Sequence, residues 1–297
     1  MLHYKWEKLT SCEFDEAIEK SRGLCILPMG CLERHADHLA VGCDSVQAQL
    51  IADKAAEKEY AVVFPVAYWL GNVMGMHTIK GKDLDAPYKK RGYIALSPEL
   101  LMSVMKELCC EIFRNGFRKI LILNSHGGND AFLNFFLSAM RYEGVNDGAI
   151  MWMSAYDSTP KRVLEDYLAN PDGYVRLTDE ELTTLERFAK TGTGGGHADF
   201  VEVAHCMAKD TALVRPELYD SCNGISTGKA DYLAKMGVHH GMAWSTNAPA
   251  AYEGYPSHGC TENIGKVMLE YTAKRVAQVF GELKNDEFCV QMAKGDI

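Results

Sequence analysis

Short apolar runs alternate with longer amphipathic segments along most of this chain. A run of about four to eight apolar residues is typical of a strand that is buried on both faces of a sheet. Segments in which apolar residues recur every three or four positions predict helices. The pattern predicts strands at residues 24–29, 61–66, 120–124 and 149–154, and helices at residues 11–21, 44–57, 97–115, 130–142, 159–190 and 261–283.

The order of these elements predicts the fold class. Strands that alternate with amphipathic helices form βαβ units, and repeated βαβ units build an α/β domain around a parallel sheet. The chain has 297 residues, enough for one large domain or two small ones, and no stretch has the composition of a linker. We therefore expect a single domain over residues 1–297.

The segment between residues 68 and 96 breaks the pattern, with several glycines, lysines and one histidine, His77. Loops of this length are usually lids, binding loops or subunit contacts. His77 could contact a substrate, and the alternative is an exposed histidine on a solvated loop. His239, His240 and His258 are likewise expected to be exposed, unless they line the pocket of a neighbouring subunit.

Composition excludes several classes of partner. The net charge of −9 argues against nucleic acid, because binding a phosphate backbone requires a basic surface. No apolar run is long enough to span a membrane, and the N-terminal residues lack the apolar core of a signal peptide. We therefore expect a cytoplasmic protein that binds neither nucleic acid nor a membrane.

The chain has ten cysteines, without a CxxC pair or a regular spacing. In a cytoplasmic protein we expect them to be small buried hydrophobic residues. Cys31 and Cys43 flank the acidic segment described next, so a Cys–His nucleophile is an alternative there. The neighbouring carboxylates disfavour it, because they raise the pKa of a thiol.

The segment after the first strand carries the candidate chemistry. Gly30 ends the strand, and it is followed by Glu33, His35 and, at the start of the next helix, Asp44. Two carboxylates and imidazole groups so close together, beside a buried strand, suit a divalent metal. The alternative is a polar loop in which Asp44 only caps the helix and Gln47 completes a capping box.

Two later segments bring further histidines. His126 follows the strand at 120–124 and precedes two glycines, which allow the backbone to turn sharply. Ligands bind at the carboxyl ends of strands in open α/β sheets, where both His126 and Glu33 would lie. A glycine-rich run before His197 lacks the lysine of a phosphate-binding loop. We interpret it as backbone that delivers His197 to the start of a helix, with Glu202 near the same face.

Three segments of the chain resemble the motifs of one family. Residues 27–39 read LPMGCLERHADHL and, with Asp44 beyond them, resemble the LPxGxxExHGxHLP…D signature of the creatininase (creatinine amidohydrolase) family. Residues 123–129, LNSHGGN, resemble its NGHGGN segment. Residues 197–202, HADFVE, resemble its HAGxxE segment. The three motifs occur in the family's order and are spread over most of the chain.

The resemblance implies a fold, a cofactor and an assembly. The family has a three-layer α/β/α sandwich with a mainly parallel sheet, usually assembled as a homohexamer. Each subunit holds two divalent metal ions, for which Zn, Mn and Fe are the candidates. We therefore expect a creatininase-like fold, two bound ions and a homo-oligomer, a hexamer by resemblance.

Carried over position by position, the resemblance also implies roles for single residues. One metal ion is expected to be held by Glu33 and His126 and the other by His35, with Asp44 bridging both. In creatininase itself the second ion also takes a glutamate where this chain has Gly128. We expect Glu202, which matches a glutamate of the later motif, to replace it.

The remaining motif residues are expected to act on the substrate or on the ligands. His197 matches the family's acid–base histidine, while His38 and Asn129 are expected to support the ligands or to contact substrate. In such a site two metals about 3.5 Å apart share a water molecule, lower its pKa and polarise a substrate carbonyl, so that hydroxide attacks it. His197 would then donate a proton to the departing group.

Departures from the family's pattern bear on the substrate. Gly127 stands where creatininase has a tyrosine, and the glycine run before His197 lacks that enzyme's tryptophan, so creatinine is a poor candidate. Ala36 and Ala40 replace the motif's glycine and proline, which could reshape the loop without removing a ligand.

Three hypotheses follow. The first is hydrolysis of an amide-like C–N bond in a small, cyclic molecule. The second is ring-opening C–C hydrolysis of a cyclic polyol diketone such as 3-dehydro-scyllo-inosose. A metal-free scaffold that kept the fold is the third.

Overall fold

The computed structural model describes residues 2–73, 92–155 and 158–295. The described strands form one sheet in the order β2-β1-β3-β4, and every neighbouring pair is parallel. They are β1 (Leu24–Met29), β2 (Val62–Val63), β3 (Lys119–Asn124) and β4 (Ala149–Ser154). The prediction of a parallel α/β sheet is confirmed, although the second strand is shorter than the predicted range 61–66.

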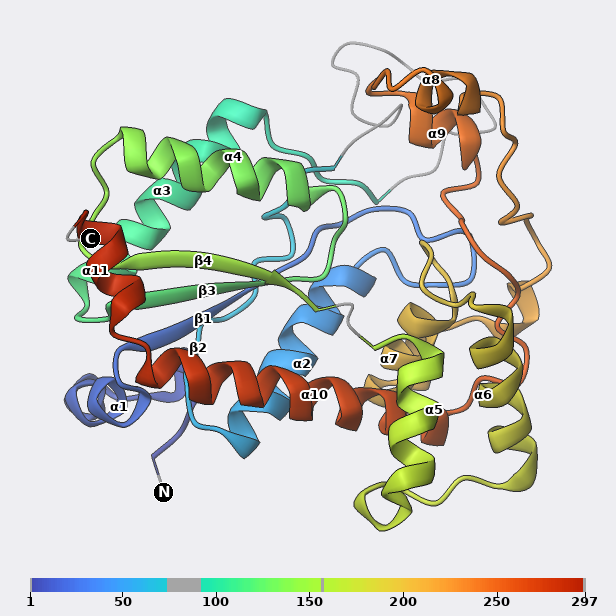
Figure 1. The fold of residues 1–297 in the computed structure, drawn as a ribbon, viewed down its shortest axis with the longest axis horizontal. Coiled ribbons are helices and arrows are strands. Elements are labelled where there is room, and N and C mark those ends of the chain that lie inside the picture. Colours follow the sequence, from blue (N-terminus) through green and yellow to red (C-terminus); the bar gives the residue numbers. More distant parts are fainter. Residues whose placement is uncertain (1, 74–91, 156–157, 296–297) are drawn as a thin grey trace.

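Alternate side chains of the strands enter two separate cores. Cys25, Leu27 and Met29 of β1 pack with α1, α3 and α4 on one face, and Leu24 and Ile26 pack with α2 and α10 on the other. Helices therefore cover both faces of the sheet, as the three-layer prediction requires (Figure 1). These helices are α1 (Phe14–Ser21), α2 (Cys43–Lys58), α3 (Pro98–Arg114), α4 (Asn129–Tyr142) and α10 (Glu262–Asn285).

A second group of helices packs at the end of the sheet toward which the strands point (Figure 1). Its core includes Leu185 of α6, Phe200 of α7 and Ile264 near the start of α10, so α10 links this group to the sheet. The group is formed by α5 (Pro160–Ala169), α6 (Asp179–Thr191) and α7 (Phe200–Lys209).

Helix starts follow local sequence signals. Ser97 accepts a hydrogen bond from the backbone of Leu100 at 3.3 Å, and Pro98 occupies the first position of α3, where no amide hydrogen is needed. The predicted helix at 159–190 is in fact two helices, because Pro171 interrupts it and Thr178 and Glu181 form a capping box that starts α6.

The remaining elements are short. None of the helices in the described ranges is both long enough and apolar enough to cross a membrane. The short α-helices are α8 (Asp231–Lys235), α9 (Ala243–Asn247) and α11 (Phe288–Lys294). Single 3-10 turns lie at Trp6–Lys8, Ser11–Glu13, Pro171–Gly173, Thr211–Leu213 and Pro216–Leu218.

Candidate metal centre

Four elements deliver the candidate ligands to one place. Because β1 and β3 are adjacent and parallel, with Met29 opposite Asn124, the loops that follow them leave the sheet side by side. The loop after β1 carries Glu33 and His35, and the loop after β3 carries His126. The first turns of α2 and α7 add Asp44 and Glu202. The structure therefore brings together all five residues that the sequence suggested as metal ligands.

Asp44 lies between two histidines. Its Oδ1 is 2.9 Å from Nε2 of His35, and its Oδ2 is 3.2 Å from Nδ1 of His126. The side chain is 1% exposed, so these contacts are made away from water. Asp44 sits inside the first turn of α2 rather than at its cap, which is Gly42, and no side-chain cap bond is formed. The alternative in which Asp44 only caps the helix is wrong.

Glu33 and Glu202 flank this central carboxylate. Oε1 of Glu33 lies 3.0 Å from Nδ1 of His126 and 3.5 Å from Nδ1 of His197, yet it is a buried oxygen without a hydrogen bond. Oε2 of Glu202 lies 3.7 Å from Nε2 of His35 and accepts a hydrogen bond from the amide of Ala198 at 2.6 Å. A buried carboxylate oxygen that lacks a hydrogen bond is suited to a cation.

Each of the three site histidines has one ring nitrogen beside a backbone carbonyl. A ring N–H that donates there leaves the second nitrogen facing the carboxylates, which is the arrangement that orients histidine ligands in metal sites. The pairs are His35 Nδ1 with Glu33 O at 3.2 Å, His126 Nε2 with Asn72 O at 3.0 Å, and His197 Nε2 with Arg34 O at 2.8 Å.

The charges in the cluster depend on one another. Burial alone would lower the pKa of His35, but Asp44 and Glu202 outweigh it and raise that pKa to about 10. The pKa of His126 is raised as well, because Glu33 and Asp44 overcome the burial that opposes its charge. Burial also disfavours the charge of Asp44, yet the two histidines hold the pKa of its carboxyl well below the usual range. The carboxylates therefore require positive charge beside them, which protons or metal ions can supply.

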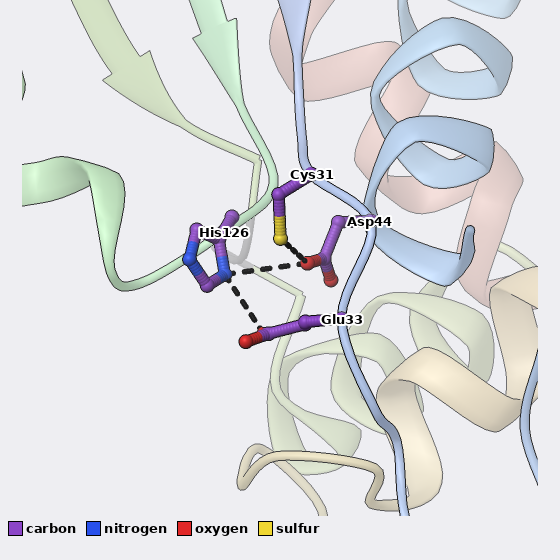
Figure 2. Close-up of side chains that lie close together, drawn as sticks. All are labelled: Cys31, Glu33, Asp44 and His126. Atoms are coloured by element: carbon purple, nitrogen blue, oxygen red, sulfur yellow. Dashed lines mark hydrogen bonds and ion pairs between the residues drawn. The ribbon is translucent and has the colours of Figure 1, made fainter. Parts of the chain in front are cut away.

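The donor atoms fit divalent metals. One group of potential ligands contains Cys31, Glu33, Asp44 and His126, whose side chains point toward one another in Figure 2. A second group contains His35, Cys43 and Glu202, and the ligand atoms within each group lie within 4.8 Å of one another. Two ligand atoms bound to one tetrahedral ion lie roughly 3.3–3.5 Å apart, close to the contacts measured around Asp44.

A pocket of about 460 Å³ opens onto this cluster. Its lining includes Glu33, His126, His197 and Glu202, together with several glycines, among them Gly127 and Gly128. The ring of His197 stacks on that of His35 with 4.3 Å between centroids, and it lies nearly perpendicular to the ring of Trp244 with 5.1 Å between centroids. His197 therefore packs against two rings while it borders the pocket. It precedes α7, in a turn where Ala198 has φ of +59°, rather than starting a helix as predicted.

One wall of this pocket could not be predicted from the sequence. Trp244 of α9 donates its indole N–H to Oε2 of Glu253 at 3.0 Å, and the backbone amide of Glu253 donates to the carbonyl of His197 at 2.9 Å. His240 is exposed, as expected, and also lines the same pocket. No local motif marks these residues, because their approach to His197 depends on tertiary packing.

The other predicted residues take supporting positions or lie elsewhere. His38 is buried, and its Nε2 bonds to the carbonyl of Ala198 at 2.8 Å, beside His197. Asn129 is buried and joins the two strand ends, donating to the carbonyl of Gly30 at 3.3 Å and to Asn124 at 2.9 Å. Neither lines the pocket. His77 lies outside the described residues.

Comparisons with known proteins point to one family. The family model described as creatininase, creatinine amidohydrolase, matches residues 7–280. A creatinine amidohydrolase of Pseudomonas putida is 23% identical over 154 residues, which are 50% of this chain and 56% of that protein. The alignment thus spans only about half of the curated relative.

Solved structures of creatininase share the fold. A creatininase mutant of the Zn-Zn type and a manganese form of creatininase each superpose with a TM-score of 0.63 at 18% identity. Both superpositions cover 94% of this chain and 98% of the other.

Proposed function

Because this chain belongs to the creatininase family, we propose that it is a metal-dependent hydrolase that cleaves an amide-like C–N bond in a small cyclic molecule. The observation that carries the proposal is Asp44, which offers one oxygen to His35 and the other to His126 in a buried cluster. Relatives of the Zn-Zn and Mn types support divalent metals as the cofactor.

The same contacts support an assignment of ligands. We assign Glu33 and His126 to one ion, His35 and Glu202 to the other, and Asp44 to both, because the measured distances pair the side chains in this way. Two ions held there would make a water molecule acidic and withdraw charge from the substrate's carbonyl oxygen.

His197 is suited to move the proton that the reaction requires. With Nε2 donating to the carbonyl of Arg34, the lone pair of Nδ1 faces Glu33 and the pocket. Nδ1 would accept a proton as the nucleophile attacks and deliver it to the leaving nitrogen as the C–N bond breaks. The stacked ring of His35 and the edge of Trp244 keep the imidazole in that orientation.

The pocket wall narrows the class of substrate. Trp244 offers an aromatic surface that replaces the aromatic residues missing at Gly127 and in the glycine run, and Glu253 adds a carboxylate beside it. Among the described residues that line the pocket, none is lysine or arginine. A neutral or cationic cyclic amide whose N–H groups can meet Glu253 fits this wall better than an anion.

One observation favours a second candidate reaction. Five glycines, at positions 127, 128, 195, 196 and 241, line the pocket and leave polar backbone exposed to it. Such a surface can accept the hydroxyl groups of a cyclic polyol diketone, whose ring would open by C–C hydrolysis with the same groups.

A substrate screen tests the proposal. Protein loaded with Zn²⁺ or Mn²⁺ is assayed against cyclic amides, formamides and cyclic polyol diketones, with chelated protein as the blank. We expect metal-dependent turnover of a cyclic amide. Turnover of the diketone alone would establish the second reaction, and turnover that survives chelation would refute the metal-dependent mechanism.

A further inference from the structure

Cys31 belongs to the acidic cluster and to none of the three apolar cores. It follows Gly30 directly at the end of β1, is fully buried, and its Sγ is 3.1 Å from Oδ2 of Asp44 (Figure 2). This is the same oxygen that faces Nδ1 of His126. The sulfur therefore shares the space in which Glu33, Asp44 and His126 converge.

The backbone holds the sulfur in this place. The carbonyl of Cys31 accepts a hydrogen bond from Oγ of Ser45 at 3.2 Å, which ties it to α2. On its other side Gly71 packs so closely that a Cβ there would lie 2.5 Å from the Cβ of Cys31. A residue locked between two segments in this way has little freedom to turn its side chain away from the carboxylates.

We propose that Sγ of Cys31 is a ligand of the metal ion that Glu33, Asp44 and His126 hold, an inference that rests on the proposed metal-dependent function. Sulfur, two carboxylates and one imidazole nitrogen give four donor atoms within 4.8 Å of one another. Binding requires the thiolate, so the S–H bond breaks on metal uptake and its proton is released to solvent.

The proposal has a chemical consequence. Thiolate is a soft ligand that favours Zn²⁺, Fe²⁺ or Co²⁺ over Mn²⁺ and Mg²⁺, which prefer oxygen. The ion beside Cys31 is therefore expected to be selected from the first set. The ion beside His35 and Glu202 need not show the same selectivity, so the two positions would differ in metal preference.

The alternative is that Cys31 only donates an S–H hydrogen bond to Asp44. Cys31→Ser separates the two roles, because a serine hydroxyl can still donate to Asp44 but is a poor ligand. Cys25→Ser is the matched control, since Cys25 is an equally buried cysteine of the preceding strand β1 whose side chain enters the apolar core.

The test is a titration of chelator-treated protein with Co²⁺, followed by absorption spectroscopy for the sulfur-to-cobalt charge-transfer band in the near ultraviolet. We expect the band in the wild type and in Cys25→Ser and its loss in Cys31→Ser. In competition between Zn²⁺ and Mn²⁺, Cys31→Ser should also reduce the preference for Zn²⁺ by at least about tenfold.

Each other outcome overturns the proposal. If Co²⁺ binds to the wild type without the band, Cys31 is only a hydrogen-bond donor, and the proposed hydrolase function stands. A band that survives in Cys31→Ser but disappears in Cys43→Ser would move the sulfur ligand to the other ion. If no divalent ion binds, the proposed function and this inference both fail.

Discussion

Asp44 shows how single residues define this site. Its two oxygens face different histidines, and its fully buried position excludes water as the compensating partner. A carboxylate in such a place needs positive charge on both sides. The carboxylates raise the pKa of both His35 and His126, so protons on these two rings would supply it in the metal-free protein, and a pair of divalent ions would replace them.

Metal ions should compete with protons for this site, so the metal affinity should depend on pH. The pKa of His35 is raised to about 10, so at neutral pH an arriving ion must displace its proton. Below that pKa the metal affinity should therefore rise with pH, by about tenfold per pH unit for each displaced proton. Calorimetric titration with Mn²⁺ in buffers of different ionisation enthalpy counts the released protons. An affinity that does not change with pH would contradict this.

A variant of His197 should distinguish the catalytic step from metal binding. Replacing it in His197→Ala removes the proton carrier but none of the assigned ligands, so we expect turnover to fall by roughly 10²- to 10⁴-fold. Metal content, measured by mass spectrometry of the purified variant, should stay at the wild-type level. If the variant instead lost metal while turnover per bound ion fell little, His197 would be a metal ligand rather than the proton carrier.

Among single residues, the sequence predicted those that follow the carboxyl ends of strands. Glu33, His35 and His126 could be found because a buried strand is recognisable and its carboxyl end marks the site. Trp244 and Glu253 could not be predicted, since no motif near them in the sequence indicates that they lie beside His197. Cys31 is buried as predicted, but its contact with Asp44 could not be predicted, because a thiol's neighbours are decided by how α2 packs on the strand end.

At the scale of elements, the junction between β1 and α2 fixes the position of Asp44. Gly30 lies against the start of α2, and a Cβ at this position would lie 2.3 Å from the amide nitrogen of Ser45. The close approach places the first turn of the helix directly over the strand end. Glycine is required here for space, whatever its conformation.

Gly30→Ala should therefore force the helix away from the strand. We expect it to lower the free energy of unfolding by about 3 kcal/mol, as overpacking against backbone does, and to weaken metal binding because Asp44 moves. Gly127→Ala is the control for stability, since a Cβ there meets nothing within 4 Å. Urea unfolding of both variants makes the comparison, and equal losses in the two would refute this packing argument.

Elements with strong periodicity were predicted well from sequence. The strand at 24–29 and the strand at 149–154 have the predicted bounds, and α2, α3 and α4 begin within one residue of the predicted starts. Errors arose where a short local signal competed with the pattern. Pro171 splits a predicted helix in two, and the turn that carries His197 was interpreted as helix because it leads directly into α7.

For the whole molecule, the cluster joins parts of the chain that are far apart in sequence. It is built where β1, β3, α2 and α7 meet, so ions bound there would connect the sheet to the helical group beside it. Because they bind only the folded chain, their free energy of binding adds to the free energy of unfolding.

Removing the metal should therefore lower thermal stability. An ion present at a thousand times its dissociation constant contributes about 4 kcal/mol, which corresponds to a fall in Tm of roughly 6 °C for a chain of this size. Calorimetry of the protein before and after EDTA measures the change, and added Zn²⁺ or Mn²⁺ should restore it. An unchanged Tm would favour the metal-free scaffold.

The single domain over residues 1–297, the cytoplasmic location and the homohexamer stay predictions. The assembly can be measured by light scattering on the purified protein.

The most direct test counts metal ions in protein purified without chelator. We predict two divalent ions per folded chain for the wild type and fewer than one for Asp44→Ala, because that carboxylate is assigned to both. Fewer than one ion per chain in the wild type, with the fold unchanged after EDTA, would contradict the account.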